Sequence, residues 1–158
     1  MSIHTMLAGF VCVTLFGAMP APVASASPEE TPAVKWSYTI SGTDASASSH
    51  LNGVLASARA AQRPVMIEFY AAWCAACRLL DRNAYSAPDV IQSADRFVTI
   101  RVDTSNGGEA TDVLAKRFGV RGLPTVAFVS SRGAALASSN IVGLVDASTL
   151  ARELRKIP

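Results

Sequence analysis

The chain has 158 residues, half of them hydrophobic, which is enough for one ordinary domain with a buried core. Only 16% of the residues are charged, the formal net charge is +2, and the fourteen Lys and Arg are scattered without forming a basic run. This balance argues against a nucleic-acid-binding protein, so we expect no nucleic-acid partner.

Residues 1–26 predict a secretory signal peptide. An apolar run from Met6 to Met19 is followed by Ala24-Ser25-Ala26, the small-residue pattern of a signal peptidase site before Ser27. The run is shorter than the about 20 apolar residues of a permanent membrane helix. A retained anchor is the alternative, because no Lys or Arg precedes the run. We expect cleavage, and therefore a periplasmic or otherwise extracytoplasmic protein.

Residues 27–49 predict a flexible leader with a possible first strand at 36–40, so the domain is expected at residues 50–158. Val65 to Tyr70 form an apolar run typical of a central strand covered on both faces. Periodicity and turn residues predict the other elements in this order: a helix at 51–61, a helix at 76–84, a helix after Asp89, a strand at 97–102, a helix ending before Gly119, a strand at 125–129, an edge strand at 134–142 and a last helix capped by Asp146. This order predicts an α/β fold in which helices flank both faces of a central mixed β-sheet.

Two cysteines, Cys74 and Cys77, lie where the central strand gives way to a helix. Removal of the signal peptide would take Cys12 with it, and the one remaining pair is not a disulfide scaffold. Free N–H groups and the positive dipole end of the helix favour a thiolate at Cys74, which is expected to attack a substrate disulfide that Cys77 then resolves. A zinc half-site is the alternative. A closed zinc site needs four ligands and only His50 remains, so we expect no metal.

Two acids flank the cysteine pair. Glu68 lies inside the apolar strand, six residues before the first cysteine, where burial would raise its pKa and let it exchange protons with the inner thiol. The alternative is a side chain that reaches solvent past the sheet edge. Asp81 lies one helical turn after Cys77, where its charge would disfavour the Cys77 thiolate. The alternative is a solvated acid paired with Arg78 or Arg82.

The segments EFYAAWCAACRLLD and FGVRGLPTVAFV resemble the thioredoxin superfamily, and most closely the C-terminal thioredoxin-like domains of the DsbD family of thiol:disulfide interchange proteins. The resemblance extends from about Leu51 to the C-terminus and implies a thioredoxin-like fold. It also implies that Pro124 is cis and lies against the cysteines, and that Leu123 offers its backbone to an extended substrate segment. We assign Trp73 to the same substrate surface, with simple packing as the alternative.

Family roles carry over residue by residue. The resemblance implies that Cys74 is the nucleophile, Cys77 the resolving thiol, Glu68 the buried acid and Asp81 a pKa-tuning acid found in DsbD-like domains. The two residues between the cysteines, Ala75-Ala76, provide no His to stabilise a thiolate, which favours a reducing poise.

These features predict an exported thiol:disulfide oxidoreductase that reduces protein disulfides, with no cofactor beyond its own redox-active disulfide. We expect a monomer whose partners are protein disulfides and a membrane electron donor, since the membrane-spanning part of the DsbD family is missing from the sequence. The alternatives are a thiol oxidase or disulfide isomerase of the same fold, and a metallochaperone that holds Cu(I) between the two thiolates.

Overall fold

The computed structural model describes residues 32–43 and 45–158. The predicted signal peptide, its cleavage site, Cys12 and the start of the predicted leader lie outside the described residues. None of the helices in the described part of the chain has the length and apolar character that crossing a bilayer requires.

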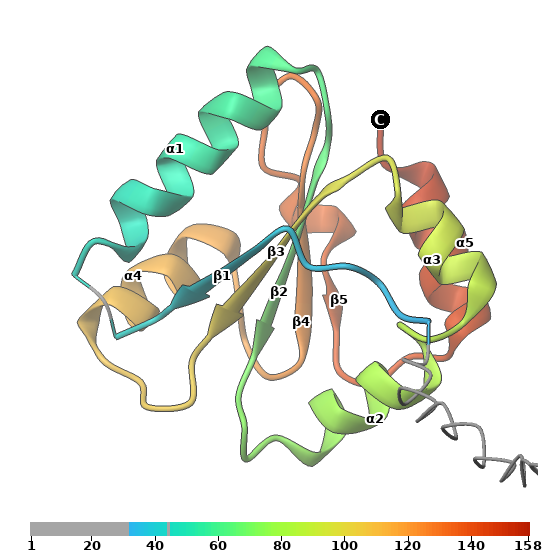
Figure 1. Cartoon of the computed structure of the whole chain (residues 1–158). Helices are drawn as coiled ribbons and strands as arrows, with labels where there is room; N and C mark the ends of the chain where they lie inside the picture. Colours follow the sequence, from blue (N-terminus) through green and yellow to red (C-terminus); the bar gives the residue numbers. More distant parts are fainter. Residues whose placement is uncertain (1–31, 44) are drawn as a thin grey trace, which may run out of the picture. The chain divides into compact units, whose positions relative to one another are not determined.

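A five-stranded mixed sheet forms the centre of the domain (Figure 1). Its strands, in chain order, are β1 (Tyr38–Ser41), β2 (Val65–Tyr70), β3 (Val98–Asp103), β4 (Thr125–Val129) and β5 (Ile141–Val142), and their spatial order is β1-β3-β2-β4-β5. The first three strands are parallel to one another, β4 is antiparallel to β2, and β5 is antiparallel to β4. The predicted α/β class with a mixed central sheet is therefore confirmed.

Helices cover both faces of this sheet (Figure 1). Two of them, α1 (Ala47–Ala60) and α4 (Glu109–Phe118), pack over one face, and α3 (Pro88–Ala94) and α5 (Ala147–Lys156) pack over the other. The remaining helix, α2 (Ala75–Asn83), follows directly after the loop that leaves β2.

The central position of β2 explains its nearly continuous apolar sequence. Successive side chains of a strand point to opposite faces, so Ile67 and Phe69 pack with α1 and α4, whereas Met66 packs with α2, α3 and α5. Glu68 lies two residues after Met66 and therefore points to the same face, which α2 covers. The charged residue that interrupts the apolar run is thus placed under the helix that carries the cysteines.

Two helix ends follow from their local sequence. Helix α4 ends at Gly119, whose φ of 67° lies in the left-handed region that glycine adopts without a Cβ clash. Helix α5 begins after Asp146, whose carboxylate accepts a hydrogen bond from the backbone N–H of Thr149 at 2.8 Å. Both ends lie where the sequence predicts them.

The first strand begins later than the sequence predicts, and it is a full member of the sheet instead of part of a flexible leader. It starts at Tyr38 instead of Trp36, and it pairs in parallel with β3. The following helix starts at Ala47, ahead of the predicted Leu51. The sheet therefore begins before the boundary expected at residue 50.

The predicted edge strand at 134–142 is wrong over most of its length. Only Ile141–Val142 is a strand; Ala135 makes an isolated bridge to Val129, and Ala137–Ser139 form a 3-10 helix. Asn140 leaves the strand pattern because its side-chain amide donates a hydrogen bond to the carbonyl of Phe118 at 2.6 Å. Ser and Asn are poor strand formers, so this tertiary contact with the end of α4 overrides the weak apolar alternation here.

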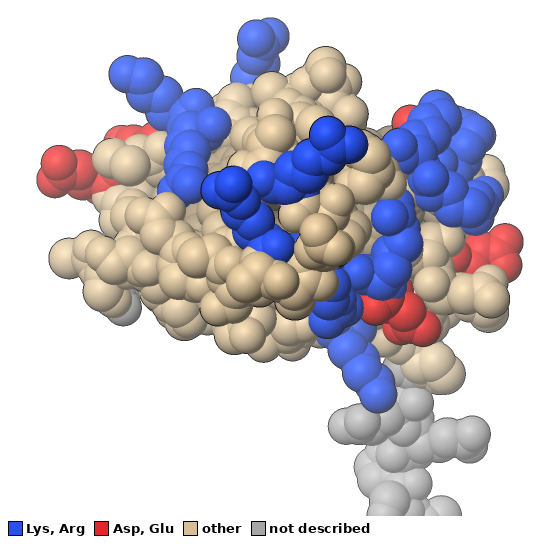
Figure 2. All heavy atoms as spheres, turned by 90° about the horizontal axis from the view of Figure 1, so that it is seen from above, with Lys and Arg blue, Asp and Glu red and all other residues tan. Residues whose placement is uncertain are grey.

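Figure 2 views the domain from the end of the sheet remote from α2. Lys and Arg outnumber Asp and Glu on this face, and they project from several separate positions. The scattered distribution read from the sequence is retained on this surface of the folded domain.

Candidate active site

Cys74 and Cys77 form a disulfide at the N-terminus of α2. Their Cα atoms are 5.3 Å apart, within the usual range for a disulfide. Cys74 is the N-cap residue, and its Sγ accepts a hydrogen bond from the backbone N–H of Cys77 at 3.1 Å. Cys74 is 6% exposed and Cys77 only 1%, so Cys74 is the sulfur nearer the surface.

The loop that presents these cysteines is held by Ser105, which follows β3. The Ser105 hydroxyl accepts a hydrogen bond from the N–H of Ala72 at 2.8 Å, and its carbonyl accepts one from the indole N–H of Trp73 at 2.9 Å. The same hydroxyl donates to the carboxylate of Asp103. On the helix side, the Arg78 guanidinium donates to the carbonyl of Ala72 at 2.7 Å. The start of α2 is therefore fixed from both sides.

The second sequence motif lies against the disulfide. The Leu123–Pro124 peptide is cis, as the sequence motif implies. Leu123 packs against the cluster formed by Ala71 and the two cysteines, and the Pro124 carbonyl accepts a hydrogen bond from the N–H of Gly143 at 2.8 Å. Two segments far apart in the sequence thus meet at the sulfur atoms.

Trp73 is the most exposed large hydrophobic side chain among the described residues, at 66%. Its indole N–H is bonded to Ser105, so the ring is oriented although its face is open to solvent. The ring is therefore not part of the hydrophobic core. An oriented aromatic ring beside the disulfide offers apolar area to another molecule.

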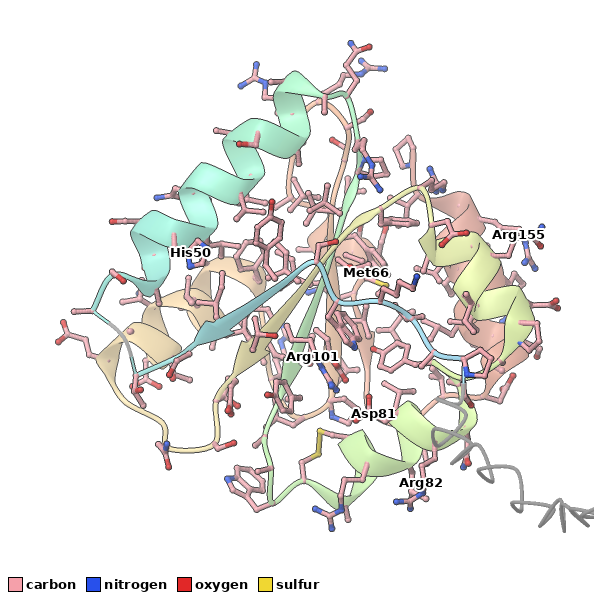
Figure 3. The ribbon with its side chains drawn as sticks, in the orientation of Figure 1. His50, Met66, Asp81, Arg82, Arg101 and Arg155 are labelled. Carbon is pink, nitrogen blue, oxygen red and sulfur yellow. A yellow bond between two sulfur atoms is a disulfide. The ribbon has the colours of Figure 1, made fainter. Side chains whose placement is uncertain are left out.

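Behind the disulfide, one arginine joins the two acids. Arg101 of β3 donates from Nε to Glu68 Oε2 at 2.7 Å and from Nη2 to Asp81 Oδ1 and Oδ2 at 2.8 and 3.0 Å. Figure 3 shows Arg101 between the sheet and α2, directed toward Asp81, with the disulfide at the start of the same helix. Glu68 is fully buried, so the alternative of a side chain reaching solvent is wrong. Asp81 pairs with Arg101, so pairing with its helix neighbours Arg78 or Arg82 is wrong too.

Burial controls the protonation of Glu68. Removal of the carboxyl from water raises its pKa from 4.5 to about 7, even though the charge and hydrogen bond of Arg101 lower it; the nearby Asp81 charge adds to the rise. Its second oxygen, Oε1, is buried without a hydrogen-bond partner, as is the hydroxyl of Tyr85. A carboxyl with a pKa near neutrality and one free oxygen is suited to accept and return a proton.

The sequence identifies the cysteines, Glu68, Asp81 and the proline motif, and the structure brings them together at one end of the sheet. The sequence does not identify Arg101 or Ser105 as residues of the site. A signal for Arg101 exists: it is a charged residue in the apolar strand at 97–102, opposite in sign to Glu68, and the two residues are direct neighbours in the β2–β3 register. Ser105 lies in a Ser-Asn-Gly-Gly turn and carries no such signal.

A disulfide at the N-terminus of a helix, next to a cis-proline loop at the end of a mixed sheet, defines a thioredoxin-like protein. A family model described as "Thioredoxin-like" matches residues 46–131. The chain belongs to this family.

Among curated proteins, the chain is similar to those named thiol:disulfide interchange protein DsbD. It is 35% identical over 97 residues to the protein of Cronobacter sakazakii, covering 61% of this chain and 17% of that protein. It is 32% identical over 124 residues to the protein of Klebsiella pneumoniae, covering 78% and 20% respectively. The chain therefore spans about a fifth of the length of these relatives.

Solved structures give the same fold. The C-terminal domain of DsbD from Neisseria meningitidis in the oxidised form matches with a TM-score of 0.62 at 23% identity, over 73% of this chain and 97% of that chain. A thioredoxin from Thermus thermophilus matches with a TM-score of 0.56 at 30% identity, over 66% and 81%.

Proposed function

We propose that the protein is an exported thiol:disulfide oxidoreductase that reduces protein disulfides outside the cytoplasm. The observation that carries this proposal is the Cys74–Cys77 disulfide at the N-terminus of α2, with Cys74 toward the surface and the Glu68 carboxyl buried behind the helix. The similarity to proteins named for thiol:disulfide interchange supports it.

The reaction begins from the reduced dithiol. The Cys74 thiolate attacks one sulfur of a client disulfide, which forms a Cys74–client disulfide and releases the other client sulfur as a thiolate that takes up a proton. The Cys77 thiol then loses its proton and attacks Cys74 Sγ. This step forms the Cys74–Cys77 disulfide and releases the second client thiol, so two electrons pass from the domain to the client.

Glu68 is the group that takes the proton from Cys77. It points to the face of the sheet that α2 covers, its Oε1 has no hydrogen-bond partner, and its pKa is raised to about 7 by burial. A base with a pKa near the working pH transfers protons most effectively.

The surroundings of the cysteines favour a reducing role. An oxidant such as DsbA is strongly oxidising because its reduced form is stabilised. Here the helix N-terminus favours the Cys74 thiolate, but Ala75 and Ala76 add no charge. When Glu68 is ionised, the two carboxylates outweigh the single positive charge of Arg101, so the cluster opposes a further negative charge. The dithiol therefore gives up its electrons readily.

The client is a protein segment in extended form. Trp73 supplies an exposed aromatic surface next to Cys74, and Leu123, which precedes the cis Pro124, packs against the two cysteines. Backbone pairing with the loop before β4 would hold the client disulfide near Cys74. The predicted signal peptide supports a periplasmic or otherwise extracytoplasmic location for this reaction, where a separate membrane protein would return electrons to the domain.

The reduction potential of the Cys74–Cys77 couple tests the proposal. The purified protein is equilibrated with glutathione buffers, and the fractions of dithiol and disulfide are measured by mass spectrometry. A value near that of thioredoxin, about −270 mV, is expected for a reductant. A value near that of DsbA, about −120 mV, would assign the protein as an oxidant instead.

Trapping tests whether proteins are the substrates. A Cys77→Ala variant retains the attacking thiol but lacks the resolving one, so it should accumulate mixed disulfides with client proteins in the periplasm. The matched Cys74→Ala variant should accumulate far fewer. If Cys77→Ala traps no protein at all, the Cu(I) carrier becomes the better assignment.

A further inference from the structure

Arg101 is the only charged group of β3 that contacts the two acids behind the disulfide. Its guanidinium uses separate nitrogens for Glu68 on β2 and for Asp81 on α2, so it links the sheet directly to the helix that carries Cys77. Its side chain is 17% exposed, whereas that of Glu68 is fully buried. Both contacts are short charge-assisted hydrogen bonds, the strong kind.

Two aromatic rings fix the plane of this guanidinium. Its central carbon lies 4.3 Å from the ring centre of Tyr70 and 4.8 Å from that of Trp36. Trp36 is itself packed edge-on against Tyr85, whose hydroxyl is among the groups that act on the pKa of Glu68. An arginine that contacts two aromatic rings and engages several donors is held in one orientation.

The charge of Arg101 is retained in this site. Burial alone would lower its pKa, but the Glu68 and Asp81 charges and hydrogen bonds outweigh burial and raise it. When Glu68 is ionised, the cluster therefore contains two negative charges and one positive charge. Without Arg101 the pKa of Glu68 would rise further, because the charge and hydrogen bond of Arg101 lower it. At any pH where both acids are ionised, the same space would then hold two uncompensated carboxylates next to a helix on which a thiolate must form.

Building on the proposed function, we propose that Arg101 is a positioning residue of the redox site. It holds Glu68 beneath α2 through Oε2, so that Oε1 takes no part in the ion pair, and it cancels one of the two negative charges so that the Cys74 thiolate can form. Arg101 acts on the sulfur through the acids and does not touch the client.

The pKa of the Cys74 thiol in the reduced full-length chain measures this effect. The rate of Cys74 alkylation by iodoacetamide is followed against pH, with Cys12 and Cys77 distinguished by fragment mass spectrometry. Arg101→Met should raise the thiol pKa by about one unit, because an opposite charge has been removed from the cluster. Arg101→Lys should recover at least half of the shift, since the charge remains although the forked geometry is lost.

A charge-balanced double variant provides the decisive comparison. Glu68→Gln with Arg101→Met removes one negative and one positive charge together, so its thiol pKa should lie close to that of the wild type. Glu68→Gln alone should give a thiol pKa below the wild type. The expected order is therefore Arg101→Met highest, wild type and double variant in the middle, and Glu68→Gln lowest.

Arg96→Met is the matched control. Arg96 also stacks on an aromatic ring, that of Phe97, and its guanidinium donates to the carbonyls of Leu154 and Ile157, but it precedes β3 at the opposite end of the strand. Its loss should leave the Cys74 pKa unchanged. The other charged groups near the site, Arg78 and Asp103, are the same in every variant.

The proposal is overturned if Arg101→Met folds and leaves the thiol pKa unchanged, if Arg96→Met produces the same shift, or if the double variant retains the full shift of Arg101→Met. Should the uncompensated Glu68 carboxylate prevent Arg101→Met from folding, the double variant and Glu68→Gln still differ by the Arg101 charge. Equal thiol pKa values in those two would then refute the proposal. Alkylation needs no client, so these results do not depend on whether the protein reduces protein disulfides.

Discussion

Glu68 is ionisable and completely buried, so the free energy of unfolding of the whole domain depends on whether its carboxyl is protonated. Burial raises its pKa to about 7 in the folded protein, whereas the unfolded chain has the ordinary value of 4.5. Between these two values the folded protein holds a proton that the unfolded chain has released. The free energy of unfolding therefore falls as the pH rises from about 4.5 to about 7.

We predict that Glu68→Gln removes this fall. The shift corresponds to about 3 kcal/mol between pH 4 and pH 8 from this group alone, since one pKa unit is about 1.4 kcal/mol. Urea unfolding of the oxidised protein at a series of pH values measures the slope directly. Glu153→Gln, at a solvent-accessible acid on α5, is the matched control and should keep the wild-type slope over this range. An unchanged slope in Glu68→Gln would show that Glu68 does not titrate in this window.

At the residue scale, the sequence predicts the site as far as each side chain carries its own signal. The spacing of Cys74 and Cys77 identifies them as a redox pair, and the position of Glu68 inside an apolar strand identifies it as a buried acid. The partner of Asp81 could not be predicted in the same way, because the nearest arginines along the helix were the obvious choice. Arg101 becomes the partner only when β3 lies beside β2, and strand order is a property of the assembled sheet.

At the scale of elements, α5 closes the face of the sheet to which Glu68 points. Leu150 and Leu154 of this helix are fully buried in the same cluster as Met66 and Leu80, which come from β2 and α2. The Leu154 carbonyl also accepts a hydrogen bond from Arg96. Helix α5 is thus part of the support beneath the redox helix although it contributes no side chain to the disulfide.

We predict that Leu154→Ala lowers the free energy of unfolding by about 2 to 5 kcal/mol, since a buried leucine is replaced by a cavity. The reduction potential of Cys74–Cys77 should change little, because no residue of α5 contacts the sulfurs. Denaturant unfolding and glutathione equilibration measure the two quantities separately. Leu144→Ala removes the same atoms from a half-exposed leucine and should cost far less. A loss of stability in Leu154→Ala no larger than that of Leu144→Ala would contradict the assigned core.

Elements were predictable where packing and local chemistry agree. The strand β2 has a nearly continuous hydrophobic pattern, and α4 and α5 each combine a hydrophobic pattern with a matching terminal residue, Gly119 and Asp146. The segment at 134–142 has alternating small and apolar residues but no strong strand former before Ile141. Its conformation is decided by contacts with β4 and the end of α4, which the local sequence does not encode.

At the scale of the whole molecule, the sheet order places the ends of β2 and β3 next to each other and under α2. This arrangement brings together the acid of one strand, the arginine of the next and the acid of the helix. The general class followed from the succession of strands and helices. The charge network could not be predicted from that succession, because it depends on which strands are neighbours and in which register they pair.

The proposed direction of electron flow has a consequence for global stability. The fold must favour the disulfide over the dithiol if the dithiol is to be a good reductant, because folding and oxidation are linked through one thermodynamic cycle. Closing the loop between cysteines three residues apart also removes chain entropy from the unfolded state, worth about 2 kcal/mol. In an oxidant the balance is reversed, since the reduced form is the stabilised one.

We therefore predict that the oxidised protein unfolds at a higher urea concentration than the reduced protein, with a difference of about 2 kcal/mol in the free energy of unfolding. Unfolding curves with and without dithiothreitol at one pH measure this difference. The double variant Cys74→Ala with Cys77→Ala cannot form the disulfide and should show no dependence on dithiothreitol. A reduced form more stable than the oxidised one would mean that the fold favours the dithiol. The protein would then accept electrons from its clients, and its assignment would change from reductant to oxidant.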